Sequence, residues 1–141
     1  MKKLIVFSVV VVLFMTGSCM THITKAEAPI MTIPLLRMKK EWTSSTTKAM
    51  ILFVSREYDY NAEQLICLAR KESTLGEDKR CGDNGKSCFL FQIKEPTWNW
   101  FVKLMGRTDL VYSNYVDQTI VTGWAIEHGL GWNWPPFKHC K

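Results

Sequence analysis

Glu72 is the acidic residue whose position in the sequence is best suited to chemistry. Apolar residues recur at helical spacing along residues 62–73, and Glu72 falls on their side, seven residues past Leu65 and three past Ala69. A carboxyl group on this core-facing side is partly desolvated, which raises its pKa and keeps it protonated near neutral pH. Such a group can act as a general acid that donates a proton to a leaving oxygen.

Helical geometry alone leaves two other interpretations of Glu72 open. It can be an exposed glutamate in the last turn of the helix, or it can form an ion pair with the neighbouring Arg70 or Lys71. In either case the carboxylate has no chemical role.

The segments around and after Glu72 add a recognisable order of motifs. They are LICLARKES at residues 65–73, GDNGKSCFLFQI at residues 82–93 and PTW at residues 96–98. This order resembles lytic transglycosylases and goose-type lysozymes. In those proteins a Glu-Ser pair ends an apolar helix, a Gly-Asp-x-Gly-x-Ser segment follows, and an apolar pair precedes Gln-Ile. The clear resemblance covers about residues 61–98, and residues 117–134 fit the C-terminal helix of the family loosely.

The resemblance implies a lysozyme-like, two-lobed α+β fold, mostly α-helical, with a central cleft. It implies cleavage of peptidoglycan between N-acetylmuramic acid and N-acetylglucosamine, with Glu72 as the single catalytic carboxyl group. Substrate assistance would replace the second carboxylate that most glycosidases use, and the product would carry a 1,6-anhydro-muramyl end. No cofactor and no metal are expected.

The resemblance also suggests which residues contact the substrate. Phe89 stands where the family commonly has Gly, so its ring either narrows the cleft or stacks on a sugar. The family's Ala-Tyr-Asn pattern has its nearest counterpart at residues 123–125, which include Trp124. The expected substrate-binding residues are Ser73, Ser87, Phe89, Phe91, Gln92 and Trp124. If residues 89–93 are extended, Gln92 points toward the cleft while its apolar neighbours point into the core.

Two alternatives to a transglycosylase follow from the same residues. A hydrolysing lysozyme would use Asp83 or Asp59 to orient a water molecule. A non-catalytic wall-binding module would result if Phe89 blocked productive binding of the glycan.

The first 19 residues have the pattern of an export signal. Lys2 and Lys3 precede an apolar run at residues 4–15, which is shorter than the roughly 20 residues of a membrane span. Residues 16–19 resemble a lipoprotein box, which would leave a lipidated Cys19, although cleavage after residue 26 or 28 is also open. We therefore expect export to the periplasm, cell envelope or extracellular space, with membrane attachment through Cys19 as one alternative.

The remaining cysteines form an even set of four, namely Cys67, Cys81, Cys88 and Cys140. An even set in a small exported domain predicts two disulfides, and the spacing favours a zinc site much less. Three pairings are possible. We prefer Cys81 with Cys88, which would stiffen the glycine-rich segment, and Cys67 with Cys140. Cys67 lies about 140° around its helix from Glu72 and can face the C-terminal tail.

The rest of the chain is predicted to form one helical domain at residues 44–141, preceded by a linker or arm at residues 20–43. Helices are expected from Ser44 or Ser45 to residue 58, at residues 62–73 with Asn61 as the cap, and at residues 97–105 and 117–128. A polar loop covers residues 76–86. Six aromatic residues stand out in so small a domain. Most of them should pack in the core and one or two should line the cleft. The six are Trp98, Trp100, Phe101, Trp124, Trp132 and Trp134.

The charge of the chain agrees with a wall polymer as partner. The 18 basic residues include Lys2 and Lys3 of the signal, so 16 remain against 13 acidic residues, a net charge of +3. This mild excess suits a polymer that carries anionic groups and is too weak and scattered to indicate nucleic acid. We expect a monomer that binds peptidoglycan strands.

Overall fold

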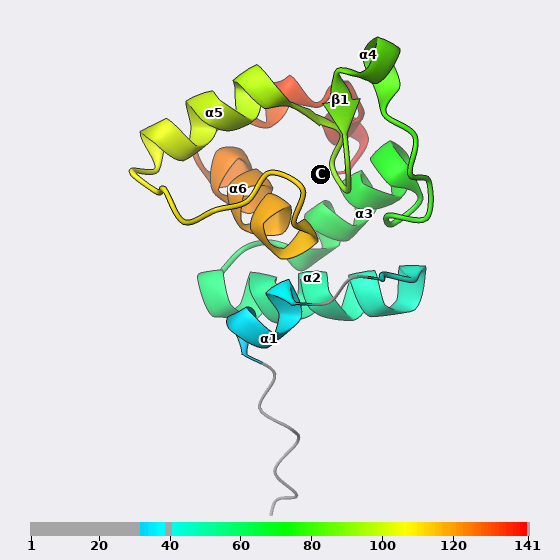
Figure 1. Ribbon diagram of the computed structural model, residues 1–141, viewed down its shortest axis with the longest axis vertical. Coiled ribbons are helices and arrows are strands. Elements are labelled where there is room, and N and C mark those ends of the chain that lie inside the picture. The colour runs from blue at the N-terminus through cyan, green and yellow to red at the C-terminus, as the bar shows by residue number, and fades with distance from the viewer. Residues whose placement is uncertain (1–31, 39–40, 141) are drawn as a thin grey trace, which may run out of the picture. The chain divides into compact units, whose positions relative to one another are not determined.

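The computed structural model describes residues 32–38 and 41–140 (Figure 1). The predicted export signal, the lipoprotein box and Cys19 lie outside these residues. The described elements are α1 (Ile33–Arg37), α2 (Ser44–Tyr58), α3 (Ala62–Ser73), α4 (Gly82–Gly85), β1 (Ser87–Cys88), β2 (Ile93–Lys94), α5 (Glu95–Leu104), α6 (Tyr115–Glu127), and the short 3-10 helices η1 (Gly131–Asn133) and η2 (Pro135–His139). The fold is mostly helical with one small antiparallel sheet, as predicted at the level of an α+β class.

The first two long helices begin at side-chain caps. Asn61 caps α3 as predicted, because its side-chain oxygen accepts a hydrogen bond from the backbone of Gln64 at 3.1 Å. The cap of α2 is Thr43 rather than Ser44 or Ser45, because Thr43 and Thr46 form a reciprocal capping box. These caps fix the bounds of α2 and α3 to residues 44–58 and 62–73.

Helix α6 is the centre of the fold and contacts α1, α2, α3, α5 and η1 (Figure 1). It begins at Tyr115, two residues before the predicted start, because Asn114 caps it through the backbone of Val116 and Asp117. Nearly all of its residues are buried. The buried side chains of Asp117 and Gln118 form hydrogen bonds with Arg37 and with the backbone of Phe91, which links α6 to the segments around it.

Residues 89–92 form a tight turn between β1 and β2, so the extended conformation considered for residues 89–93 is present at Ile93 and wrong for residues 89–92. Ser87 pairs with Lys94 and Cys88 with Ile93 in the antiparallel register. Both Phe89 and Gln92 have positive φ angles, 68° and 48°, which an extended strand does not allow. The apolar side chains of Leu90 and Phe91 are fully buried, so the core holds a turn in a place where a short apolar run suggests a strand.

The described part of the predicted arm contains the short helix α1. Arg37 at its end donates from Nε to the Oδ1 atom of Asp117 at 2.6 Å, and Asp117 is buried in α6. The other oxygen of Asp117 accepts a hydrogen bond from the backbone of Val111 at 2.9 Å. Leu36 is buried against the core. Residues 33–37 therefore pack as part of the domain and do not extend away from it.

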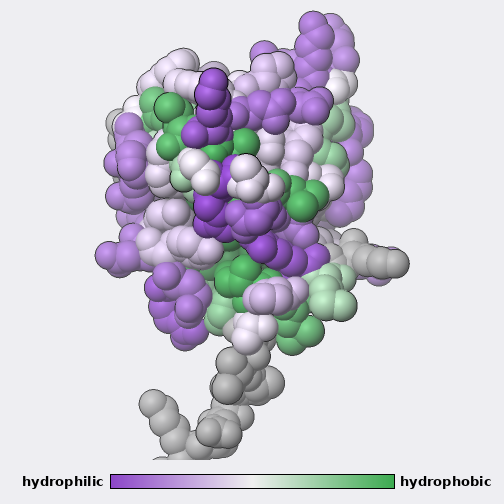
Figure 2. Space-filling view, turned by 60° about the vertical axis from the view of Figure 1, so that its left-hand side comes forward, coloured by the Kyte–Doolittle hydropathy of each residue, from purple (hydrophilic) through white to green (hydrophobic). Residues whose placement is uncertain are grey.

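The face that lies at the left in Figure 1 carries hydrophobic residues in small patches separated by hydrophilic ones (Figure 2). Scattered exposed apolar residues of this kind are normal for a folded domain. None of the helices in residues 32–38 and 41–140 is long and apolar enough to cross a membrane.

Two disulfides join the four cysteines in the preferred pairing, Cys67 with Cys140 and Cys81 with Cys88. The first connects the middle of α3 to the end of the chain across 73 residues, and the second closes a loop of 7. Disulfides persist in oxidising compartments, so the pairs indicate an exported environment.

We predict that the two disulfides contribute unequally to stability. In the chain-entropy model, loss of the Cys67–Cys140 bridge lowers the free energy of unfolding by about 4 kcal/mol, and loss of the Cys81–Cys88 bridge by about 2 kcal/mol. Chemical denaturation of the two double-alanine variants measures the difference. Peptide mapping without reduction that links Cys67 to Cys81 or Cys88 would contradict the pairing.

Candidate active site

Glu72 lies on the wall of a pocket of about 670 Å³. Four parts of the chain form this pocket: the end of α3, the segment from α4 to β1, the start of α5 with β2, and the C-terminal tail. The lining residues are Glu72, Gly82, Asp83, Ser87, Gln92, Ile93, Lys94, Thr97, Trp132, Asn133, Trp134, Pro135 and Pro136. Of the predicted site residues, the pocket therefore brings together Glu72, Ser87 and Gln92.

The environment of Glu72 favours the protonated carboxyl group. Burial against the core, with a smaller contribution from the negative charge of Asp83, raises its pKa to about 7. None of the salt bridges among the described residues includes Glu72, so the ion pairs considered with Arg70 and Lys71 are absent there. A half-buried carboxyl group with this pKa can both donate and accept a proton near neutral pH.

Asp83 is the second carboxylate of the pocket and has a different environment. Its Oδ2 atom accepts a hydrogen bond from the hydroxyl of Ser87 at 2.9 Å and pairs with the ammonium of Lys94 at 3.0 Å. These two contacts, first Lys94 and then Ser87, lower the pKa of Asp83 below its usual value. The pocket thus contains one carboxyl group whose pKa lies near neutral pH and one whose lowered pKa keeps it ionised. This division suits acid–base chemistry.

Ser73 and Phe91, which were expected to contact the substrate, are buried and do not line the pocket. The Ser73 hydroxyl is buried, where it donates to the carbonyl of Leu90 at 2.7 Å and accepts from the backbone of Gly76 at 2.9 Å. Phe91 is fully buried. Ser73 thus attaches the β1–β2 turn to the end of α3 beside Glu72, and the backbone of Phe91 attaches the same turn to Gln118 of α6 and to Trp134 of the tail.

Gln92 lines the pocket, but its side-chain amide is already occupied by the protein. Its Oε1 atom accepts from the backbone of Gly82 at 2.8 Å, and its Nε2 atom donates to the carbonyls of Arg80 and Phe89, each at 3.1 Å. The prediction of an amide free for sugar assumed an extended strand. In the observed turn, Gln92 holds the segment that carries Asp83 against the hairpin.

Three other candidates lie away from the pocket. Phe89 packs edge-on against Tyr112 with ring centroids 5.1 Å apart, and Trp124 stacks on His128 at 4.3 Å. Neither ring is among the lining residues, so substrate contact at Phe89 and Trp124 is not supported. Asp59 ends α2 in the left-handed conformation and does not line the pocket either, which leaves Asp83 as the one second carboxylate there.

The tail supplies two aromatic walls, in agreement with the expectation that one or two aromatic residues line the site. Trp134 is buried, and its Nε1 atom donates to the carbonyl of Phe91 at 2.8 Å. The Trp132 side chain is 69% exposed. Lys94 and Asn133 also line the pocket, and neither was among the predicted site residues, because neither belongs to a local sequence pattern. Thr97 follows Pro96 in the quoted motif, which is the signal that could have identified it.

Comparisons with family models, with curated proteins and with solved structures found no match for this chain. The assignment of a function therefore depends on the residues of the pocket and on the motifs that position them.

We predict that Glu72→Gln makes the fold more stable at pH 8. The pKa of Glu72 in the folded protein, about 7, is above its ordinary value of 4.5. Its contribution to the free energy of unfolding is therefore complete below pH 4.5 and is lost as pH rises through 7. A neutral amide removes this loss. Thermal unfolding from pH 5 to pH 8 should show a smaller decline for Glu72→Gln than for wild type. Glu63→Gln, the same change at an exposed position of α3, should follow wild type. Equal declines in all three proteins would show that Glu72 is ordinarily solvated.

We predict that Gln92→Ala lowers the free energy of unfolding by about 2 kcal/mol, because three hydrogen bonds to backbone groups are lost. Urea denaturation measures this change, and Gln64→Ala is the control, since no hydrogen bond of the Gln64 side chain is found among the described residues. Equal stability of the two variants would be inconsistent with a structural role for Gln92.

Proposed function

We propose that this protein is a peptidoglycan-cleaving lytic transglycosylase with Glu72 as its catalytic acid and base. The observation that carries the proposal is the half-buried carboxyl group of Glu72, with a pKa of about 7, on the wall of an open pocket. The order of the motifs at residues 65–98, which resembles that enzyme family, supports the same assignment. The pocket would be the central cleft of a two-lobed, lysozyme-like fold, with α4, β1 and β2 in the smaller lobe.

The proposed reaction has two steps that use the same carboxyl group. Protonated Glu72 donates its proton to the glycosidic oxygen, the bond from that oxygen to C1 of the muramyl residue breaks, and the substrate's own acetamido oxygen stabilises C1. The Glu72 carboxylate then accepts the proton of the muramyl 6-hydroxyl as that oxygen bonds to C1. This step yields the 1,6-anhydro ring and restores protonated Glu72 without water.

Asp83 has an electrostatic role in this scheme. Its ionised carboxylate raises the pKa of Glu72 and thereby keeps the acid protonated at the start of the reaction. Lys94 and Ser87 hold it in place through a single oxygen, Oδ2. Both rings of the tail, those of Trp132 and Trp134, would contact the flat faces of the sugars.

A hydrolysing lysozyme is the second candidate, and one observation favours it. Both contacts of Asp83 go to Oδ2, and no hydrogen bond to Oδ1 is found among the described residues, so this atom is free to orient a water molecule. Hydrolysis would leave reducing ends in place of anhydro ends. A non-catalytic module has less support, because the Phe89 ring expected to block the site packs on Tyr112 outside the pocket.

We predict that Glu72→Gln reduces digestion of purified cell walls by about 100-fold or more, the usual cost of removing a general acid. Turbidity loss of a wall suspension measures the rate, and Glu63→Gln is the matched control on the same helix. For wild type, the rate should decline as pH rises above 7, because the acid form of Glu72 is lost.

Asp83→Asn and the chemistry of the products decide between the two candidates. For a transglycosylase, mass spectrometry of the fragments shows anhydro ends. Asp83→Asn then keeps its activity, but its digestion rate begins to decline at a lower pH than that of wild type. For a hydrolase, reducing ends appear and Asp83→Asn removes most of the activity. Near wild-type digestion by Glu72→Gln would disprove both assignments.

A further inference from the structure

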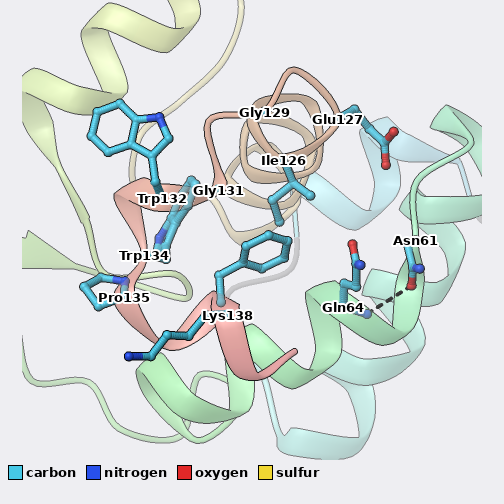
Figure 3. A pocket seen from close by; sticks show the side chains of 11 residues that line it. Asn61, Gln64, Ile126, Glu127, Gly129, Gly131, Trp132, Trp134, Pro135 and Lys138 are labelled. Atoms are coloured by element: carbon cyan, nitrogen blue, oxygen red, sulfur yellow. Dashed lines mark hydrogen bonds between the residues drawn. The ribbon is translucent and has the colours of Figure 1, made fainter. Parts of the chain in front are cut away.

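A second pocket, of about 800 Å³, is lined in part by the C-terminal tail (Figure 3). The first turn of α3, the end of α6 and the tail form its walls. The lining residues are Asn61, Gln64, Ile126, Glu127, Gly129, Gly131, Trp132, Trp134, Pro135, Phe137 and Lys138. Glu72 and Asp83 are not among them, so this pocket is separate from the candidate active site.

The two pockets share one wall. Trp132, Trp134 and Pro135 line both of them. Trp134 is fixed by its hydrogen bond to the carbonyl of Phe91, whereas the Trp132 indole is 69% exposed at the boundary between the pockets. The aromatic wall that these residues form therefore borders both pockets.

The side opposite this aromatic wall presents polar side chains that form no hydrogen bond or ion pair within the part of the chain that the structure describes. In Figure 3, Gln64 and Glu127 lie across the pocket from Trp132 and Trp134. Among the described residues, neither the Gln64 amide nor the Glu127 carboxylate forms a side-chain hydrogen bond or an ion pair. The amide both donates and accepts, and the carboxylate accepts from hydroxyl groups.

The pocket is also held in a fixed shape. The Cys67–Cys140 disulfide joins α3, which carries Gln64, to the tail that forms the opposite wall. Gly131 lets the chain pass close to Phe137, since a Cβ atom at this position would be 2.5 Å from the Phe137 ring. A preformed pocket loses little conformational entropy when a ligand binds.

We propose that the second pocket binds a neutral sugar residue of the same glycan strand that reaches Glu72, an inference that rests on the proposed function. The exposed Trp132 indole would contact the apolar face of the sugar, and Gln64 with Glu127 would bind its hydroxyl and acetamido groups. Lys138 and Glu127 have opposite charges, so the pocket has no net charge and favours a neutral ligand over an acidic stem peptide. The pocket would thus select long strands over short fragments.

Binding of chitooligosaccharides, which contain N-acetylglucosamine and no peptide, tests this site. All proteins carry Glu72→Gln, so that no strand is cut, and titration calorimetry compares the hexasaccharide with the disaccharide. Adding Gln64→Ala and Glu127→Ala together should lower the affinity for both ligands unequally. The fold loss for the hexasaccharide should be about tenfold greater than the fold loss for the disaccharide. Trp132→Ala should weaken binding of the hexasaccharide, whereas Trp100→Ala, which removes an exposed indole of α5 outside both pockets, should not.

Equal losses for the two ligands, no loss at all, or binding only when a stem peptide is attached would overturn the proposal. Glu57→Ala, an exposed carboxylate of α2, controls for the general effect of charge. Wall digestion by the wild-type protein is measured in parallel. Absence of digestion together with length-dependent binding would reject the lytic function alone, whereas digestion together with length-independent binding would reject the second pocket alone.

Discussion

The structure depends on satisfying the backbone polar groups of a turn that lies inside the protein. Leu90 and Phe91 are fully buried, and the turn's own backbone hydrogen bond, from Gln92 to the carbonyl of Phe89 at 3.3 Å, leaves their peptide groups to other partners. Side chains from three separate segments do so instead. Ser73 binds the carbonyl of Leu90, Gln118 accepts from the backbone of Phe91 at 3.0 Å, and Trp134 donates to the carbonyl of Phe91. Loss of any one partner would leave a buried group unpaired, at a cost of about 1–3 kcal/mol.

This network also determines where the candidate chemistry lies. Ser73 follows Glu72 directly, so the bond that attaches the turn to α3 also fixes the helix end that carries the acid. The hairpin brings Ser87 and Lys94 into register, and together they hold Asp83 beside Glu72. The pKa of Glu72 is raised as a consequence of this packing, through desolvation and the neighbouring charge. Stability and proposed activity therefore share the same contacts.

The C-terminal tail has a comparable double role. Its Trp134 completes the core, its Cys140 is bonded to Cys67 on α3, and its exposed Trp132 separates two pockets. In a domain of this size the core alone is modest, and a long-range disulfide limits the freedom of the unfolded chain. The Cys67–Cys140 disulfide, which compensates for the small core, also holds the aromatic wall of the tail in place. On the proposed function, this wall faces the glycan strand.

The sequence by itself determined the local features: the bounds of α3 and its Asn61 cap, the core-facing side of Glu72 and the even set of cysteines. These follow from periodicity, capping and composition, which act over a few residues. Tertiary structure alone decided that residues 89–92 turn inside the core and that Gln92 binds the backbone. It also decided that Lys94 pairs with Asp83. The reason is that a short apolar run can be buried in a strand or in a turn, and the peptide groups of Leu90 and Phe91 bind partners that are distant in sequence.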